Sequence, residues 1–256
     1  MILEVTGLVT RTVALSEADC LLSLFTAEKG MITAMAKGAR RLSNRSNAAA
    51  QLFCYARFLL YRRGDKYWVR EAELIESFFG LREDILRTAL ASYLCDVIND
   101  SATGQPEPQL LRLILNALYA TAAGRYDPDL IKAAFEWRAM AQLGFMPDVT
   151  GCRDCGRTEG NFLLYVMDGT IVCDDCRASL SERETEAGER VAVELMPPGV
   201  LHAVRYVLSC PLEKLLSFSL DEEEKHLFCR AAESYLTNQL ERSFRSLEFY
   251  HQVKEL

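Results

Sequence analysis

A chain of 256 residues is long enough for one large domain or two modest ones, each with its own hydrophobic core. Half of the residues are hydrophobic and a quarter are charged, which is ordinary composition for a soluble globular protein. No apolar stretch approaches membrane-spanning length, because Arg, Asn or Glu interrupts the long apolar segments. The first residues carry neither the basic start nor the apolar core of a signal peptide, so we expect a cytoplasmic protein.

The net charge of −7 is unevenly distributed along the chain. Residues 1–70 hold eleven Lys and Arg against five Asp and Glu, a balance of +6. The remaining residues hold eighteen against thirty-one, a balance of −13. A basic amino-terminal part on an acidic body favours partners that carry negative charge, although local imbalance of this size is also common without such partners.

Residues 1–78 are rich in β-forming side chains and contain no long helical period. Five strands are expected: Ile2–Val13, Leu21–Thr26, Met31–Ala36, Gln51–Tyr61 and Lys66–Ile75. Turn signals at Lys29-Gly30 and at Arg62–Asp65 separate neighbouring strands. The pattern predicts a small Greek-key barrel such as an OB-fold, with an SH3-like barrel as the alternative, and hence an α+β chain.

Residues 79–256 switch to helical periodicity and predict an all-helical domain. Expected helices cover Leu81 to Thr103, Pro106 to Gly124, Pro128 to Gly144, Pro197 to Leu208, and Asp221 to Leu240 as the last helix. Prolines at the starts and glycines at the ends mark several of these boundaries. The acidic segment from Ser181 to Glu194 is expected to be a loop.

Four cysteines form two Cys-x-x-Cys pairs, Cys152 with Cys155 and Cys173 with Cys176, separated by seventeen residues. This spacing is typical of a four-cysteine Zn²⁺ site. Two disulfides or a redox dithiol are the alternatives, but the first suits an exported chain and the second requires only one pair. We therefore expect one structural Zn²⁺ per chain.

The expected metal site defines a zinc ribbon over residues 150–178, inserted within the helical domain. A strand over Phe162–Met167 and a hairpin turn at Asp168-Gly169 fit between the two pairs. Four thiolates leave no open position for water, so a zinc-dependent hydrolase is disfavoured unless spectroscopy reveals a water ligand. The five other cysteines stand singly among apolar residues and are expected to be buried.

Enzymatic motifs are scarce in the sequence. The three histidines lie in the last quarter of the chain without a nearby nucleophile motif, and there is no phosphate-binding glycine loop. We therefore expect a protein without catalytic residues.

A basic loop is expected after the third strand. It contains Lys37, Gly38, Arg40, Arg41 and Arg45. Glycine permits close approach of backbone to phosphate, and guanidinium groups bind phosphate in a bidentate manner. The loop therefore predicts contact with nucleic acid, although a merely solvated basic loop would have the same composition.

The strand around Tyr55 to Arg63 supports the same interpretation. Alternation places Tyr55, Arg57, Leu59, Tyr61 and Arg63 on one face. Interleaved aromatic and basic groups suit single-stranded nucleic acid, because bases stack and phosphates need positive charge. The alternative is that the tyrosines pack on the helical domain. The facing of nearby Trp68 is left open.

Two segments carry a more specific pattern. One runs from Leu24 to Gly30 and on through Ala36-Lys-Gly-Ala-Arg-Arg41, and the other runs from Phe135 to Pro147 into Cys152-x-x-Cys155-Gly156. Together they resemble the RecO family of bacterial DNA-repair and recombination mediators. Ala72-Glu73-Leu74 also stands where the family often has such a triplet. The similarity extends over most of the chain, but Asp168 to Cys173 departs from the Gly-Gly pair of many relatives.

The resemblance implies an amino-terminal OB-fold, a helical domain and an embedded zinc finger. It also implies binding to single- and double-stranded DNA, annealing of complementary strands, and loading of RecA together with RecR. The acidic tail of single-stranded-DNA-binding protein is a further implied partner, and a nucleoid-associated location follows. Lys37, Arg40 and Arg41 match the family's basic segment, and Cys152, Cys155, Cys173 and Cys176 match its zinc ligands.

Docking of an acidic tail requires a basic residue beside an apolar groove, and Lys132, Arg138 and Arg205 are the candidates in the helical part. A protein-interaction scaffold with a zinc ribbon is the alternative function. It predicts DNA affinity no better than background, unaffected by substitution of the basic loop.

Overall fold

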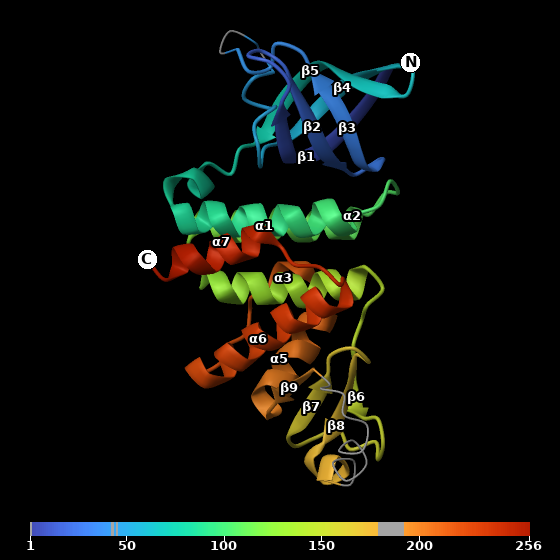
Figure 1. Cartoon of the computed structure of the whole chain (residues 1–256), viewed down its shortest axis with the longest axis vertical. Coiled ribbons are helices and arrows are strands. Elements are labelled where there is room, and N and C mark those ends of the chain that lie inside the picture. Colours follow the sequence, from blue (N-terminus) through green and yellow to red (C-terminus); the bar gives the residue numbers. More distant parts are fainter. Residues whose placement is uncertain (1, 42–43, 45, 179–191) are drawn as a thin grey trace. The chain divides into compact units, whose positions relative to one another are not determined.

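The computed structural model describes residues 2–41, 44, 46–178 and 192–256. The chain divides into two compact units (Figure 1). The first comprises Met1–Arg125 together with Phe244–Leu256, and the second comprises Tyr126–Ser243.

A closed five-stranded barrel forms the amino-terminal part of the first unit. Its strands are β1 (Ile2–Ala14), β2 (Cys20–Thr26), β3 (Gly30–Ala36), β4 (Tyr55–Arg63) and β5 (Lys66–Glu76). The strand order is β1-β2-β3-β5-β4, with β4 pairing back to β1 and with β5 parallel to β3. This is the arrangement of an OB-fold, so the sequence-based prediction is confirmed and the SH3-like alternative is excluded.

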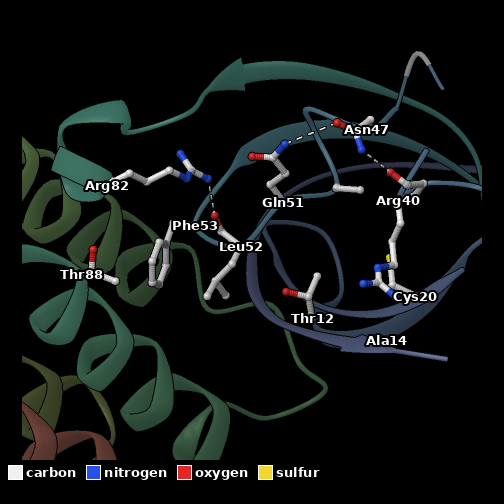
Figure 2. Close-up of a pocket in the computed structure, with 12 residues that line it drawn as sticks. Thr12, Ala14, Cys20, Arg40, Asn47, Gln51, Leu52, Phe53, Arg82 and Thr88 are labelled. Atoms are coloured by element: carbon white, nitrogen blue, oxygen red, sulfur yellow. Dashed lines mark hydrogen bonds between the residues drawn. The ribbon is translucent and has the colours of Figure 1, made fainter. Parts of the chain in front are cut away.

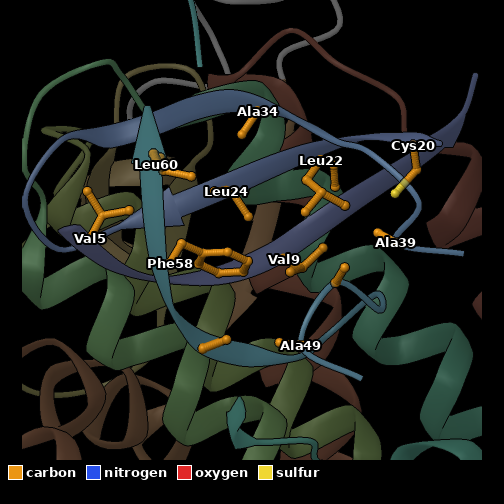
Figure 3. Packing of buried hydrophobic residues seen from close by; sticks show 13 residues of the cluster. Val5, Val9, Cys20, Leu22, Leu24, Ala34, Ala39, Ala49, Phe58 and Leu60 are labelled. Carbon is orange, nitrogen blue, oxygen red and sulfur yellow. The ribbon is translucent and has the colours of Figure 1, made fainter. Parts of the chain in front are cut away.

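The barrel encloses an apolar core built by strand alternation (Figure 3). Val5 and Val9 of β1, Leu22 and Leu24 of β2, and Phe58 of β4 are fully buried. Burying each such side chain stabilises the fold by about 1.5–3 kcal/mol relative to exposure. Because these residues point into the barrel, the alternating side chains of β4 and β5 point to solvent. The outward side chains form the candidate interface described below.

Strand β4 begins at Tyr55, four residues later than the sequence predicted. The preceding segment turns sharply because Phe53 adopts a φ of 68° in the left-handed region. Its N–H donates to the carbonyl of Val9 at 2.9 Å, and the N–H of Val9 donates to the carbonyl of Cys54 at 2.9 Å. These two hydrogen bonds of the turn take the place of the strand pairing that a start at Gln51 would have made.

Helices complete the first unit. They are the 3₁₀ helix η1 (Phe79–Glu83), α1 (Ile85–Ser101), α2 (Pro108–Ala123) and α7 (Arg245–Lys254). Asp84 caps α1 by accepting hydrogen bonds from the N–H groups of Leu86 and Arg87. Pro108 opens α2 at its first turn, and Gly124 ends it with a φ of 63°.

Helix α7 was not expected from the sequence, which placed the last helix before residue 240. It lies beside α1 (Figure 1), and Phe244 at its start packs edge-on against Tyr93 with ring centroids 5.7 Å apart. The segment is short, and its helix is stabilised by this packing against a sequence-distant partner. The barrel is joined to α1 by a 2.7 Å hydrogen bond between Thr10 and Asn99.

The second unit combines helices with a small sheet. The helices are α3 (Pro128–Gln142), α5 (Pro198–Ser209), η2 (Leu212–Lys214) and α6 (Glu222–Gln239). Helix α6 begins where the sequence predicted, and Asp221 caps it by accepting from the N–H of Glu224. Trp137 of α3 stacks on Tyr235 of α6 with ring centroids 5.3 Å apart.

None of the helices in the described ranges combines the length and apolar content that crossing a bilayer requires.

The small sheet has the order β6-β8-β7-β9. Its strands are β6 (Asp148–Cys152), β7 (Phe162–Tyr165), β8 (Thr170–Cys173) and β9 (Val193–Met196). The predicted hairpin between β7 and β8 is present. The expected loop to Glu194 is wrong at its end, because β9 begins at Val193 and pairs with β7; residues 181–191 lie outside the described part of the chain. A four-residue strand after an acidic run carries too little periodicity to be recognised locally.

The single cysteines are buried as expected in four of five cases, and Cys229 is half-buried. Burial raises the pKa of their thiols; for Cys229 the value is about 12.

Candidate nucleic-acid interface and metal centre

The loop after β3 is held against the barrel by its own backbone. Gly38 adopts a φ of 65°, and its N–H donates to a carboxylate oxygen of Asp19 at 2.8 Å. The N–H of Arg41 then donates to the carbonyl of Gly38 at 3.0 Å, which closes a turn. Glycine is required here because side chains rarely adopt this left-handed conformation.

The basic side chains of this loop have different environments. Arg40 donates from its guanidinium to the carbonyl of Ser16 at 2.6 Å, so it anchors the loop to the turn between β1 and β2. Lys37 and Arg41 are exposed. Arg45 lies outside the residues that the structure describes.

Arg40 also lines a cavity of about 520 Å³ between the loop, the barrel and the start of α1. Figure 2 shows Arg40 at one end and Arg82 at the other, with Asn47 and Gln51 between them. Arg82 donates to the carbonyl of Leu52 at 2.9 Å. The described lining contains no carboxylate, so the cavity extends the positive character of the loop.

Tyr61 and Trp68 form an aromatic pair on the outer face of the barrel. They lie opposite each other in the β4–β5 ladder, with ring centroids 6.2 Å apart and planes 18° apart. The ammonium group of Lys37 lies 5.0 Å from the centre of the Trp68 ring. Parallel pairing of β3 with β5 brings the basic loop to this position, which resolves the facing of Trp68.

Arg63 and Lys66 stand on the same face as the aromatic pair. They are cross-strand partners at the hairpin end, two residues beyond Tyr61 and two before Trp68. Because side chains alternate, the inward positions of β5 are Tyr67 and Val69, which pack on the barrel core. We refer to these five outward residues as the aromatic–basic face: Lys37, Tyr61, Arg63, Lys66 and Trp68.

The other predicted residues of β4 have a different setting. Arg57 is exposed and forms ion pairs with Glu73 at 3.0 Å and with Glu4 at 3.5 Å. Tyr55 is half-buried, and its pKa is raised by burial and by the nearby Glu28 carboxylate. This end of the strand is therefore balanced in charge, unlike the end that carries Tyr61 and Arg63.

The four cysteines predicted to share a metal lie together in the second unit. The Sγ atoms of Cys152, Cys155, Cys173 and Cys176 are all within 4.8 Å of one another. A Zn²⁺ ion about 2.3 Å from four thiolates places neighbouring sulfurs about 3.8 Å apart. The Sγ atoms of Cys155 and Cys173 are 3.7 Å apart, so the donor set fits a tetrahedral metal site.

Backbone N–H groups support the thiolate form of the cluster. Burial alone would raise the pKa of Cys152, but the N–H groups of Cys173, Cys155 and Asp154 lower it to about 6. The pKa of Cys176 is raised because its thiol hydrogen-bonds to Cys155 and Cys173. Four crowded sulfurs with one easily ionised member suit a cation that neutralises several thiolates at once.

The candidate cations for an acidic tail all have internal partners. Lys132 is buried and bonds to Glu136 at 2.9 Å and to Glu233 at 2.8 Å. Arg138 donates to carbonyls at the end of α5, from Val207 to Cys210. Arg205 donates to the carbonyls of Val149, Thr150 and Thr158. These side chains therefore hold the second unit together.

Comparison with known proteins identifies two matching family models. The one described as "Recombination protein O N terminal" matches residues 1–78, and "Recombination protein O C terminal" matches residues 82–248. The DNA repair protein RecO of Acetivibrio thermocellus is 31% identical over 250 residues, covering 96% of this chain and 95% of the relative. The protein of the same name from Desulfitobacterium hafniense is 32% identical over 244 residues, covering 94% and 86%. A third, from Symbiobacterium thermophilum, is 30% identical over 253 residues, covering 96% and 95%.

Proposed function

Because the chain belongs to the RecO family of DNA repair proteins, we propose that it is a recombination mediator without catalytic activity. It binds single- and double-stranded DNA through the amino-terminal barrel and anneals complementary strands. Together with RecR it helps to load RecA onto DNA coated by single-stranded-DNA-binding protein, whose acidic tail it recognises. It works in the cytoplasm, associated with the nucleoid.

One observation carries the DNA-binding proposal. Among the residues that the structure describes, Lys37, Arg41, Arg63 and Lys66 are exposed and form no ion pair. Phosphate contacts by such cations release counterions and supply most of the affinity for nucleic acid. The metal has a separate, structural role: Cys152, Cys155, Cys173 and Cys176 hold one Zn²⁺ that stabilises the ribbon.

The test is fluorescence anisotropy of labelled single-stranded DNA at several salt concentrations. The double variant Lys37→Gln/Arg41→Gln is the informative one, since Arg40 is left in place as the loop's anchor. Each lost phosphate contact on a single strand makes the slope of log K against log salt less steep by about 0.7, so two contacts remove about 1.4.

The matched control is Arg112→Gln/Arg125→Gln, which removes two exposed positive charges at α2 and beyond its end. This control is expected to keep the wild-type slope. A loop variant with the wild-type slope would show that the loop does not touch phosphate. A wild-type protein with only background affinity would instead favour the scaffold alternative.

A further inference from the structure

The aromatic–basic face places two half-buried rings among unpaired cations. Tyr61 and Trp68 point outward from the barrel, and neither belongs to its apolar core. Met35 of β3 lies opposite Trp68 in the parallel pairing and is also half-buried. Both aromatic side chains keep part of their surface exposed, while the indole Nε1 of Trp68 is buried without a hydrogen-bond partner in the described part of the chain.

The cations on and beside β4 and β5 differ in their partners. Arg57, Arg62 and Arg70 each lie within 4.0 Å of a carboxylate. In the described ranges, the cations of the aromatic–basic face, Lys37, Arg63 and Lys66, form no such pair. Arg63 and Lys66 are moreover directly opposite each other, and like charges in this position destabilise a strand pair. A bound anion would remove that repulsion.

We propose that Tyr61 and Trp68 form a stacking platform for unpaired bases and that Lys37, Arg63 and Lys66 bind the phosphates beside it. The platform makes the protein prefer single-stranded over double-stranded DNA, because the faces of bases in a duplex are already stacked on one another. This inference rests on the proposed DNA-binding function and specifies which state of DNA the barrel selects.

Lys37 contacts the Trp68 ring in the absence of DNA and a phosphate when DNA is bound. Its ammonium group covers part of the Trp68 ring, but an exposed cation–π contact is weaker than stacking of a base on an aromatic side chain. An incoming base therefore displaces the ammonium group, and the flexible side chain follows the phosphate. The basic loop and the platform then act on the same nucleotide.

The test compares an oligo(dT) strand with a blunt duplex, using anisotropy on wild type and Trp68→Ala. Loss of one stacking partner weakens single-strand binding on the order of tenfold. Duplex affinity stays within about twofold, since no base face is available there to lose. The salt slope stays at the wild-type value, because stacking releases no counterions.

Trp68→Phe is the second variant, since phenylalanine keeps a ring in the half-buried site. It retains part of the single-strand preference if the platform acts by stacking. Tryptophan fluorescence supplies a direct readout: Trp137, the other tryptophan, is fully buried, so quenching by oligo(dT) in wild type must vanish in Trp68→Phe.

Two results overturn the inference while leaving the proposed function intact. Equal loss of single-strand and duplex binding in a folded Trp68→Ala protein would mean that Trp68 only supports the barrel. Unchanged single-strand affinity in that variant would mean that bases do not stack there. If wild type binds neither form of DNA, the proposed function itself fails, and the platform with it.

Discussion

The metal site yields the sharpest stability prediction. Cys155 is the exposed cysteine of the four, so Cys155→Ser removes one candidate ligand without opening a void in the core. Only two residue pairs, Asp148 with Thr170 and Cys152 with Ile171, join β6 to β8. The metal is expected to hold these two strands together, because so short a parallel ladder contributes little by itself.

The size of the effect follows from binding to the folded state. An ion present at a thousand times its dissociation constant stabilises that state by about 4 kcal/mol. In a domain of intermediate length, 1 kcal/mol corresponds to about 4 °C in Tm. Removal of the metal by a chelator, or Cys155→Ser, is therefore expected to lower the Tm of the ribbon-containing unit by roughly 15 °C.

Differential scanning calorimetry measures the shift, and elemental analysis should find one zinc per chain in wild type. Cys229→Ser is the matched control, because this half-buried cysteine lies outside the cluster. Wild type purified without metal, or a Cys155→Ser protein that melts together with the Cys229→Ser control, would refute the assignment.

Two further substitutions test the packing around the sites. Lys132→Met removes the cation that pairs with Glu136, which is 0% exposed. The substitution should lower the free energy of unfolding, measured in urea, by about 3–5 kcal/mol. Burial alone would lower the pKa of Lys132, but the carboxylates of Glu136 and Glu233 raise it above 10.5. The stability that this ion pair gives to the wild-type protein is therefore complete at neutral pH and declines only above about pH 10.5. Gly38→Ala forces a side chain into a φ of 65°, with its Cβ 3.3 Å from Asn44 Nδ2, and should destabilise the protein by about 1 kcal/mol. Its DNA affinity should fall while the stability of the metal unit stays unchanged; an unaltered melt and affinity would show that the turn is not needed.

Local signals in the sequence were sufficient for much of the fold. The strands of the barrel, the proline starts of α2, α3 and α5, and the start of α6 at Asp221 depend on residues within a few positions of one another. The spacing of the two cysteine pairs was likewise enough to select the four thiols that the fold gathers into one cluster. Each of these signals has a period or an offset that operates over a short stretch of chain.

Elements that depend on a distant partner were missed or misplaced. Helix α7 and strand β9 are short, and each is stabilised by packing on α1 or pairing with β7 far away in the sequence. Lys132 looked like a docking cation, but the fold buries it between Glu136 and Glu233. Burial and charge pairing are properties of three-dimensional neighbours, which composition does not reveal.

The candidate interface shows the same division. Alternation along β4 correctly placed Tyr61 and Arg57 on the outward face, because that period is local. Only the pairing of strands decided that Glu4 and Glu73 neutralise Arg57, while Trp68 and Lys37 join Tyr61. The sequence by itself determined which residues of β4 share a face, because that alternation is local. The tertiary structure decided where Trp68 faces and which charges remain unpaired, since strand register brings together residues that are distant along the chain.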